Sequence, residues 1–191
     1  MKKIAWITLM SFVLVFLADC VADRQPATAP PAPTYIIGGG KIVGNYYIHE
    51  EKGYNIAIPH QEWVATSLPI LDVVFRSEKG GGWMGTAALA MPESFLFEDV
   101  NSWWVSIISA KFGWTDVKIV DEKDLTIAGH SAKVVVFEFT SRNRRQVDMT
   151  YHIWKPAGTY NLYRVRMTCF KGKFEEFLDV FKAFVNSFSF L

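Results

Sequence analysis

Residues 174–188, FEEFLDVFKAFVNSF, decide the fold because they form the clearest amphipathic pattern in the chain. Seven apolar side chains recur there at three- and four-residue steps, namely Phe174, Phe177, Leu178, Phe181, Phe184, Val185 and Phe188. Charged residues fill the positions between them, as expected for a helix with one buried face. Burying one such Phe contributes about 1.5–3 kcal/mol, which favours a core helix over a helix lying on a membrane. The pattern predicts a closing helix packed against the rest of the domain.

Upstream of this helix, short apolar runs show the alternation of half-buried β-strands. A first pair of strands, 46–50 and 54–59, flanks the turn Glu51-Lys52-Gly53. Further runs follow at 71–78, 83–91, 117–127, 132–141, 147–155 and 160–169, with turn residues such as Gly80-Gly81-Gly82 between them. Because these runs follow one another through short connections, we expect antiparallel pairing.

One segment in the middle of the chain switches to a helical period. Between Ser94 and Gly113, apolar residues recur every three or four positions, Glu98 and Asp99 lie near the start, and Gly113 is a stop signal. Trp103 and Trp104 widen its apolar face, which we expect to pack on the sheet. The sequence thus predicts an α+β fold, in which a central antiparallel sheet of about six or seven strands is flanked by helices.

The N-terminus has the features of an export signal. Lys2 and Lys3 precede an uncharged, mostly apolar run from Ile4 to Ala18, and Cys20 stands at its exit. A membrane span needs about 20 apolar residues and a signal h-region fewer. The run lies between these lengths and nearer the signal, which leaves an uncleaved anchor or a core helix as alternatives.

Two processing sites remain open. Leu17-Ala18-Asp19-Cys20 resembles the bacterial lipobox, which implies that the Cys20 thiol is acylated and becomes the mature N-terminus. Asp19 departs from the small residue usual before the cysteine. The rival cleavage site, Cys20-Val21-Ala22, would release the chain from Asp23. On the lipobox interpretation the protein is exported and anchored by lipid in the bacterial cell envelope, on the periplasmic or surface side.

Composition divides the chain into three parts. Residues 1–19 form the signal peptide, residues 20–44 a Pro- and Gly-rich tether, and residues 45–191 a single domain. The whole chain has 20 Lys and Arg against 19 Asp and Glu. Removing residues 1–19, which contain Lys2, Lys3 and Asp19, leaves 18 of each sign. A neutral domain lacks the basic surface that nucleic-acid binding requires, so a nucleic-acid partner is not expected.

Several stretches of the domain resemble PsbP-like domains. They are Tyr54-Asn55-Ile56-Ala57-Ile58-Pro59 with Trp63 beyond it, the strand meander after a mid-chain helix, and the closing Phe181-x-x-x-Val185-Asn186-Ser187-Phe188. The resemblance implies an antiparallel sheet sandwiched by helices, as in bacterial envelope lipoproteins of the DcrB and LpqN kind. Members of this family have diverse roles, mostly in binding, so fold alone does not assign a function.

No catalytic, cofactor or metal-binding signature is visible. His49, His60, His130 and His152 have no metal-ligand spacing, and a zinc site would have to be assembled by folding. Glu138 and Asp148 lie on neighbouring predicted strands, where they form either a carboxylate pair or salt bridges to Arg164 and Arg166. Cys169 ends an apolar segment and is expected to be a small buried residue.

The basic loop 142–145 is the candidate contact surface. Arg142, Arg144 and Arg145 at a hairpin tip suit anionic headgroups or an acidic partner, or simply form a solvated turn. Two functions follow. The first is a noncatalytic envelope lipoprotein that binds a protein partner or supports assembly of an envelope complex. The alternative is a carrier of a small apolar or lipid ligand held between sheet and helix, with tryptophans among the lining residues, namely Trp63, Trp83, Trp114 and Trp154.

Overall fold

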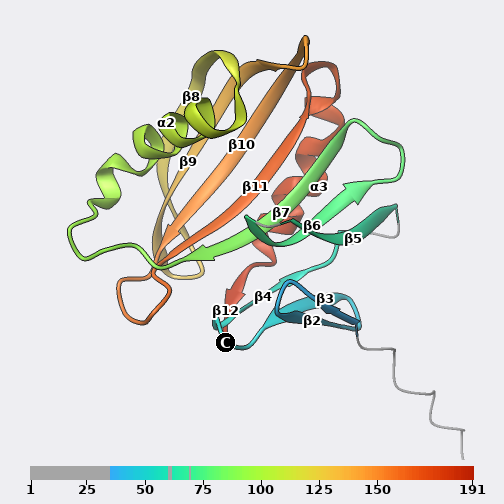
Figure 1. Cartoon of the computed structure of the whole chain (residues 1–191). Coiled ribbons are helices and arrows are strands. Elements are labelled where there is room, and N and C mark those ends of the chain that lie inside the picture. The colour runs from blue at the N-terminus through green and yellow to red at the C-terminus, as the bar shows by residue number, and fades with distance from the viewer. Residues whose placement is uncertain (1–34, 60–61, 69) are drawn as a thin grey trace, which may run out of the picture. The chain divides into compact units, whose positions relative to one another are not determined.

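A computed structural model describes residues 35–191 except 60, 61 and 69. Its largest element is an antiparallel seven-stranded sheet in the order β5-β6-β7-β11-β10-β9-β8 (Figure 1). The strands are β5 (Trp63–Leu68), β6 (Leu71–Ser77), β7 (Gly82–Leu89), β8 (Thr115–Ile127), β9 (His130–Ser141), β10 (Arg144–Trp154) and β11 (Leu162–Phe170). Neighbouring strands in the sheet are joined in most cases by short hairpins, which confirms the expected antiparallel meander.

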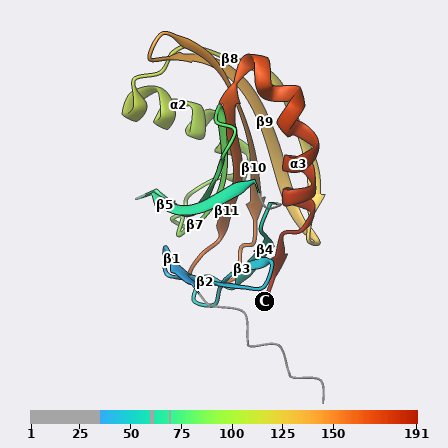
Figure 2. The ribbon, with the colours of Figure 1, turned by 90° about the vertical axis from the view of Figure 1, so that its right-hand side faces the viewer.

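Two helices cover opposite faces of this large sheet. Figure 2, a view along its edge, shows α2 (Val100–Phe112) on one side and α3 (Phe174–Asn186) on the other. Each helix is preceded by a short 3-10 turn, η1 (Phe97–Asp99) and η2 (Lys171–Lys173) respectively. The α2 helix ends at Gly113, whose φ of 62° gives the left-handed C-cap that glycine adopts without strain. The expected α+β fold with flanking helices is confirmed.

The α3 face of the large sheet holds the main apolar core. Phe181 is fully buried against Tyr151 of β10, Phe184 lies against Phe75 of β6, and Phe177 lies against Trp63 of β5. The expected stripe on the closing helix is therefore core. Phe188 is also buried, but it lies beyond the helix, just before the short strand β12 (Ser189–Phe190).

A second, five-stranded sheet lies at one end of the large one, in the order β1-β2-β3-β4-β12. Its strands are β1 (Tyr35–Ile37), β2 (Gly40–Val43), β3 (Tyr46–His49) and β4 (Tyr54–Ala57), with β12 paired to β4. The sequence predicts β3 and β4 as a strand pair of the central sheet, whereas they belong to this second sheet. The segment predicted as a tether, residues 20–44, includes β1 and β2.

The two sheets are joined by a buried polar cluster around Asp72. Its carboxylate accepts hydrogen bonds from Tyr54 Oη at 2.9 Å and from the Ala88 backbone N–H at 2.9 Å, and Lys52 Nζ lies at 2.5 Å. Gly38 approaches the Asp72 backbone so closely that an added Cβ would lie 1.7 Å from its carbonyl oxygen. The β1–β2 hairpin is therefore tied to the large sheet through a contact that only glycine permits.

The N-terminal predictions concern residues outside the described part of the chain. The signal peptide, the lipobox with Cys20 and most of the tether all precede Tyr35. Within the described residues, no helix combines the length and the apolar character needed to cross a bilayer.

Candidate functional site

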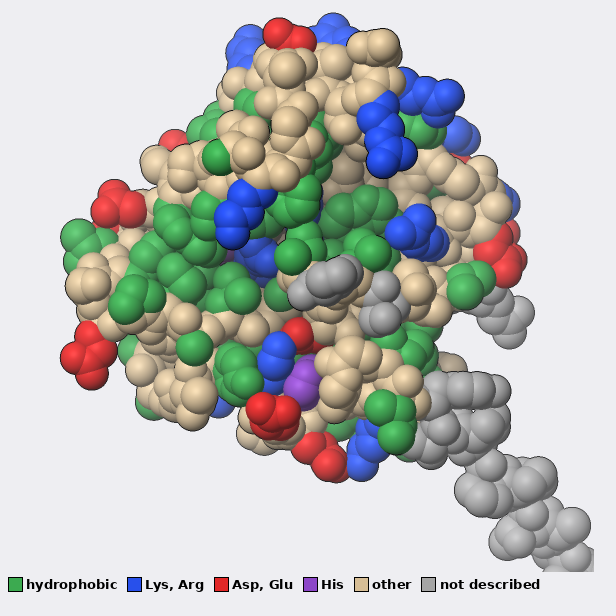
Figure 3. All heavy atoms as spheres, viewed as in Figure 1, with side chains coloured by type: hydrophobic (Ala, Val, Ile, Leu, Met, Phe, Trp, Pro, Cys, Tyr) green, Lys and Arg blue, Asp and Glu red, His purple; other side chains and the backbone are tan. Residues whose placement is uncertain are grey.

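The α2 helix covers only part of its face of the large sheet. Its buried side chains Trp104 and Ile108 pack on β9, against Val135, Phe137 and Phe139. The β6–β7–β11 part of the same face borders two open cavities instead. Figure 3 shows this face, where apolar side chains gather around its centre and basic side chains lie among them.

The first cavity, which we call the α2 groove, lies between α2 and the strands β6, β7 and β11. It has a volume of about 410 Å³. Its walls are mostly apolar, and its charged lining residues are Lys52, Asp72, Lys111 and Arg164. The apolar walls include Ile70, Leu71, Leu89, Trp103, Ile107 and Phe112. A concave apolar site with a few polar groups is the usual form of a small-ligand site.

Arg164 on β11 is the buried cation of this groove. The residue is 4% exposed, and its guanidinium carbon lies 4.0 Å from the ring centroid of Trp104. Its Nε has no hydrogen-bond partner among the described residues. Burial, with a smaller contribution from neighbouring Arg166, lowers the pKa of Arg164 to about 9, so the side chain stays charged near neutral pH. A buried, incompletely paired cation favours an anionic ligand.

Arg166, two positions along β11, differs because it has a buried counter-ion. Its Nε lies 2.5 Å from Asp148 Oδ2. The same carboxylate accepts hydrogen bonds from Thr150 Oγ1 at 2.6 Å and Thr168 Oγ1 at 2.5 Å. Three indole rings surround the Arg166 guanidinium at 4.8–5.2 Å, those of Trp83, Trp104 and Trp114. Asp148 is thus fully engaged by Arg166 and the threonines, and Arg164 is left with the unmatched charge.

His152 lies on the same face of β10 as Asp148, as the strand alternation predicts. It is fully buried, with its ring 6.2 Å from that of Trp104, and neither ring nitrogen has a partner among the described residues. Burial, together with the charges of Arg164 and Arg166, lowers the pKa of His152 well below its usual value. The imidazole is therefore neutral at physiological pH.

The second cavity, which we call the arginine basin, lies at the other end of this sheet face. It has a volume of about 660 Å³ and is lined by Arg76, Arg142 and Arg144, by Trp83, and by the backbone of the β6–β7 turn. Arg142 and Arg144 come from the β9–β10 hairpin, whose turn residues Arg142 and Asn143 have φ values of 50° and 61°. The Arg144 guanidinium lies over the Phe170 ring at 5.2 Å.

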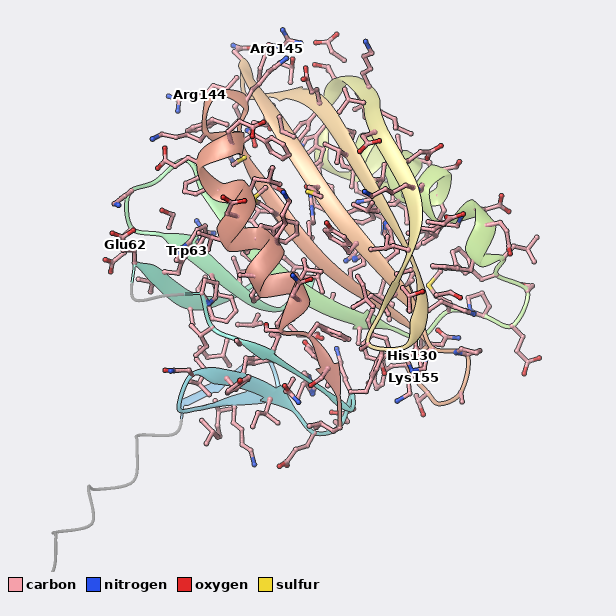
Figure 4. All side chains as sticks on the ribbon, turned by 180° about the vertical axis from the view of Figure 1, so that it is seen from behind. Glu62, Trp63, His130, Arg144, Arg145 and Lys155 are labelled. Atoms are coloured by element: carbon pink, nitrogen blue, oxygen red, sulfur yellow. The ribbon has the colours of Figure 1, made fainter. Side chains whose placement is uncertain are left out.

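The three arginines of the predicted contact surface, Arg142, Arg144 and Arg145, do not all lie on the same side of the sheet. Figure 4 labels Arg144 and Arg145 at the hairpin tip. Alternation along β10 sends Arg144 into the basin and Arg145 to the α3 side, where its Nη2 lies 3.1 Å from Glu138 Oε2. Arg76 joins the basin from β6 and was not selected, because a single arginine before a glycine turn carries no distinctive signal.

The prediction that Glu138 and Asp148 form a carboxylate pair is wrong. Glu138 lies opposite Val147 in the β9–β10 register, and Asp148 is one position further along. Successive residues of a strand point to opposite faces, so Glu138 and Asp148 lie on opposite sides of the sheet. The alternative, a salt bridge from Asp148 to Arg166, is confirmed, whereas Glu138 pairs with Arg145 and Lys171.

The remaining histidines and the cysteine occupy separate environments. His49 is buried beside Tyr47 and Tyr54. His130 lies against Phe190, and Lys155 Nζ lies 4.4 Å from the centroid of the same Phe190 ring; Figure 4 labels His130 and Lys155. His60 is outside the described residues. Cys169 is buried in the α3-face core, and burial raises its pKa to about 12. In the described part of the chain, no group of three His, Cys, Asp or Glu side chains is placed to hold a metal.

Of the four tryptophans expected at a pocket, only Trp83 lines one of the two cavities. Trp63 belongs to the core. Trp114 stacks on Phe139 and Trp154 stacks on Phe97, with ring centroids 3.7 Å and 5.6 Å apart respectively. The groove uses Trp103 and Trp104 of α2 instead, residues that the sequence assigned to packing on the sheet.

The fold has counterparts among solved structures. No protein-family model matches the chain, and no curated protein matches it in sequence. A cyanobacterial PsbP (CyanoP) from Synechocystis superposes with a TM-score of 0.59 at 13% identity, over 76% of this chain and 91% of that one. A protein of unknown function from Pseudomonas aeruginosa gives 0.48 at 12% identity, over 81% and 94%. LpqN of Mycobacterium tuberculosis, described as involved in cell envelope biogenesis, gives 0.46 at 6% identity, over 71% and 82%. On the similarity to CyanoP, this chain has a PsbP-like fold.

Proposed function

We propose that this protein is a noncatalytic binding protein that holds an anionic ligand with an apolar portion in the α2 groove. One observation carries the proposal: Arg164 is a buried cation at the groove whose Nε has no partner among the described residues. Asp148 does not satisfy it, because that carboxylate is engaged by Arg166 and two threonines. Because the Arg164 side chain also lines the groove, a ligand carboxylate there would offset its unmatched charge.

The rest of the groove supports the same ligand class. Lys111 adds positive charge, whereas Lys52 and Asp72 form an ion pair whose carboxylate is also held by Tyr54 and the Ala88 N–H. The apolar walls suit an alkyl or aryl chain, whose burial contributes about 25 cal/mol per Å². The volume of about 410 Å³ lies within the range of small-molecule sites.

The ionisable groups beside the groove support binding rather than catalysis. His152 is held neutral by burial and is fully enclosed, so it has no access to the groove as a base. A catalytic acid or base requires a pKa near the working pH and contact with the reacting atoms.

A protein partner is the second candidate. Ile70 is 44% exposed and Phe112 is 39% exposed, and both line the groove. Large exposed apolar side chains at one site are typical of docking surfaces. A partner that inserts an apolar side chain next to a carboxylate would satisfy the same groove and would fit a role in assembling an envelope complex.

The proposed location rests on the N-terminal sequence. We propose export and acylation at Cys20, which would anchor the domain to a membrane of the bacterial envelope. Metabolic labelling with a palmitate analogue should mark the wild-type chain but not a Cys20→Ser variant. An unlabelled wild-type protein whose mature chain starts at Asp23 would contradict the anchor without affecting the groove.

The groove is tested with a matched pair of amphiphiles, dodecanoate and dodecanol, followed through tryptophan fluorescence and calorimetry. Dodecanoate should bind about tenfold more tightly than dodecanol, because a charge-assisted hydrogen bond contributes about 1.5–3 kcal/mol. Arg164→Met should remove this preference. Ile107→Glu, on the partly exposed wall of the groove, should weaken the binding of dodecanoate while Arg164 is retained. Lys182→Met on the outer side of α3 is the control.

Three outcomes are informative. Equal binding of the acid and the alcohol would contradict the role of Arg164. Failure of both probes to bind would remove the small-ligand proposal. In that case an acidic, apolar partner peptide that loses binding in Ile107→Glu would support the second candidate.

A further inference from the structure

We infer that the arginine basin is a second ligand site, which takes a phosphate group carried by a larger polar molecule. This inference is independent of the α2 groove, because the two cavities share no lining residue. They lie along the same face of β11, one beside Arg164 and the other beside Thr168. Four residues of an extended strand separate these positions, a distance of about 13 Å.

Two hairpin tips bring the arginines together. Arg76 is the first exposed residue of β6, just before the β6–β7 turn, while Arg142 lies in the β9–β10 turn and Arg144 directly follows it. Alternation places Arg144, Gln146 and Thr168 on one face of the sheet, and all three line the basin. Stacking on Phe170 restricts the Arg144 guanidinium to this side. The arginines therefore lie close together because of the strand order and the side-chain alternation of the sheet.

The charge of the basin is uncompensated. In the described part of the chain, no carboxylate lines the basin and none of its three arginines forms an ion pair. Arg145 provides the contrast within the same hairpin, because its partner is Glu138, which also binds Lys171. Three neighbouring like charges repel one another, and an anion placed between them removes that repulsion.

The lining favours a phosphate over a carboxylate. A phosphate ester carries up to two negative charges and three acceptor oxygens, and the planar fork of arginine matches this geometry with paired hydrogen bonds. The polar lining residues Ser77, Ser141 and Gln146 suit a hydroxylated carrier, and the Trp83 ring supplies one flat wall. The volume of about 660 Å³ lies within the range of small-molecule sites and leaves room for more than the phosphate alone.

The phosphate has two possible sources, a soluble phosphoester or a lipid headgroup. Glycerol 3-phosphate, with glycerol as its uncharged control, represents the first and is followed by calorimetry on the full chain. Vesicles of phosphatidylcholine with phosphatidic acid, compared with phosphatidylcholine alone, represent the second. Because the wild type and the variants carry the same N-terminal segment, its contribution cancels when they are compared on the same vesicles.

The variants exploit the division within the hairpin. The double variant Arg142→Gln, Arg144→Gln should weaken binding of the phosphate probes by about tenfold, since charge-assisted hydrogen bonds are lost. Arg76→Gln, from the other hairpin, should act in the same direction. Arg145→Gln removes one charge from the same tip on the opposite face, as Arg76→Gln removes one from the basin, and should change binding by less than about twofold. The thermal midpoint should stay constant in all of them because these side chains are exposed.

Each result decides a point. Binding of both probes supports a phosphate site of either source, glycerol 3-phosphate alone assigns a soluble phosphoester, and phosphatidic acid vesicles alone assign a membrane headgroup. The inference is overturned if neither probe binds, or if Arg145→Gln weakens binding as much as the double variant does. The second result would mean that net charge at the hairpin, and not the basin, attracts the anion.

Discussion

The two faces of the large sheet are built from the same strands but bury different chemistry. Toward α3, β10 presents the apolar residues Val147, Met149, Tyr151 and Ile153. Toward α2, β10 and β11 bury six polar or charged side chains, Asp148, Thr150, His152, Arg164, Arg166 and Thr168. Burying apolar groups stabilises a fold, whereas burying charges costs free energy unless they are paired. We therefore expect the α3 face to hold the domain together and the α2 face to carry its binding sites.

The largest effect should come from the α3 face. Phe181→Ala should lower the free energy of unfolding by about 3–5 kcal/mol, because it leaves a cavity in a fully buried cluster. Ile107→Ala on the partly exposed side of α2 should lower it by no more than about 1–2 kcal/mol. Urea denaturation of both variants measures the difference. Equal losses would mean that the two faces contribute alike to stability.

A buried charge on the α2 face is the next test. Asp148→Asn should destabilise the domain by about 3 kcal/mol, because Arg166 is then buried without a counter-ion. The double variant Asp148→Leu, Arg166→Met replaces the pair by apolar groups and should recover most of this loss in chemical denaturation. If the double variant is less stable than Asp148→Asn, the pair itself stabilises the face beyond its charge balance.

The pH dependence should reveal the buried histidine. The pKa of His152 is lowered in the folded state, so below about pH 6.5 the unfolded chain binds a proton that the folded chain does not. The free energy of unfolding is therefore unaffected by His152 above that pH and decreases at lower pH, by up to about 1.4 kcal/mol per pH unit. His152→Gln should reduce the slope of unfolding free energy between pH 6.5 and 5. Part of this slope should remain in the variant, because burial also lowers the pKa of His49. An unchanged slope would assign the effect to other groups.

The smallest effect should come from the exposed ion pairs at the rim of the α3 face. Glu138→Gln removes the partner of both Arg145 and Lys171, yet these three side chains are solvated. Exposed pairs contribute little because water and salt screen them. The thermal midpoint should stay within experimental error of the wild type at moderate salt. A clear drop would show that this rim, and not only the apolar core, secures the α3 face.

Local sequence patterns were sufficient to predict much of the fold. Helical spacing identified α3 and α2, and period-two alternation identified six of the large-sheet strands and placed Asp148 and His152 on one face. These features depend on residues close in sequence, whose geometry the backbone period sets directly. The strands β1, β2 and β12 have too few residues to show a clear period, and the six residues of β5, WVATSL, do not alternate between apolar and polar side chains. All four strands pair with a neighbouring strand of a sheet.

The candidate sites were decided by tertiary structure. The sequence by itself determined which residue types were available, including the arginines of the hairpin and the charged pairs of β10 and β11. Only the register of β9 and β10 separated Glu138 from Asp148. Only the packing of α2 over part of the sheet opened the groove beside Arg164, and only the meeting of two hairpin tips placed Arg76 beside Arg142 and Arg144. Such contacts join residues far apart in the chain, so no local period records them.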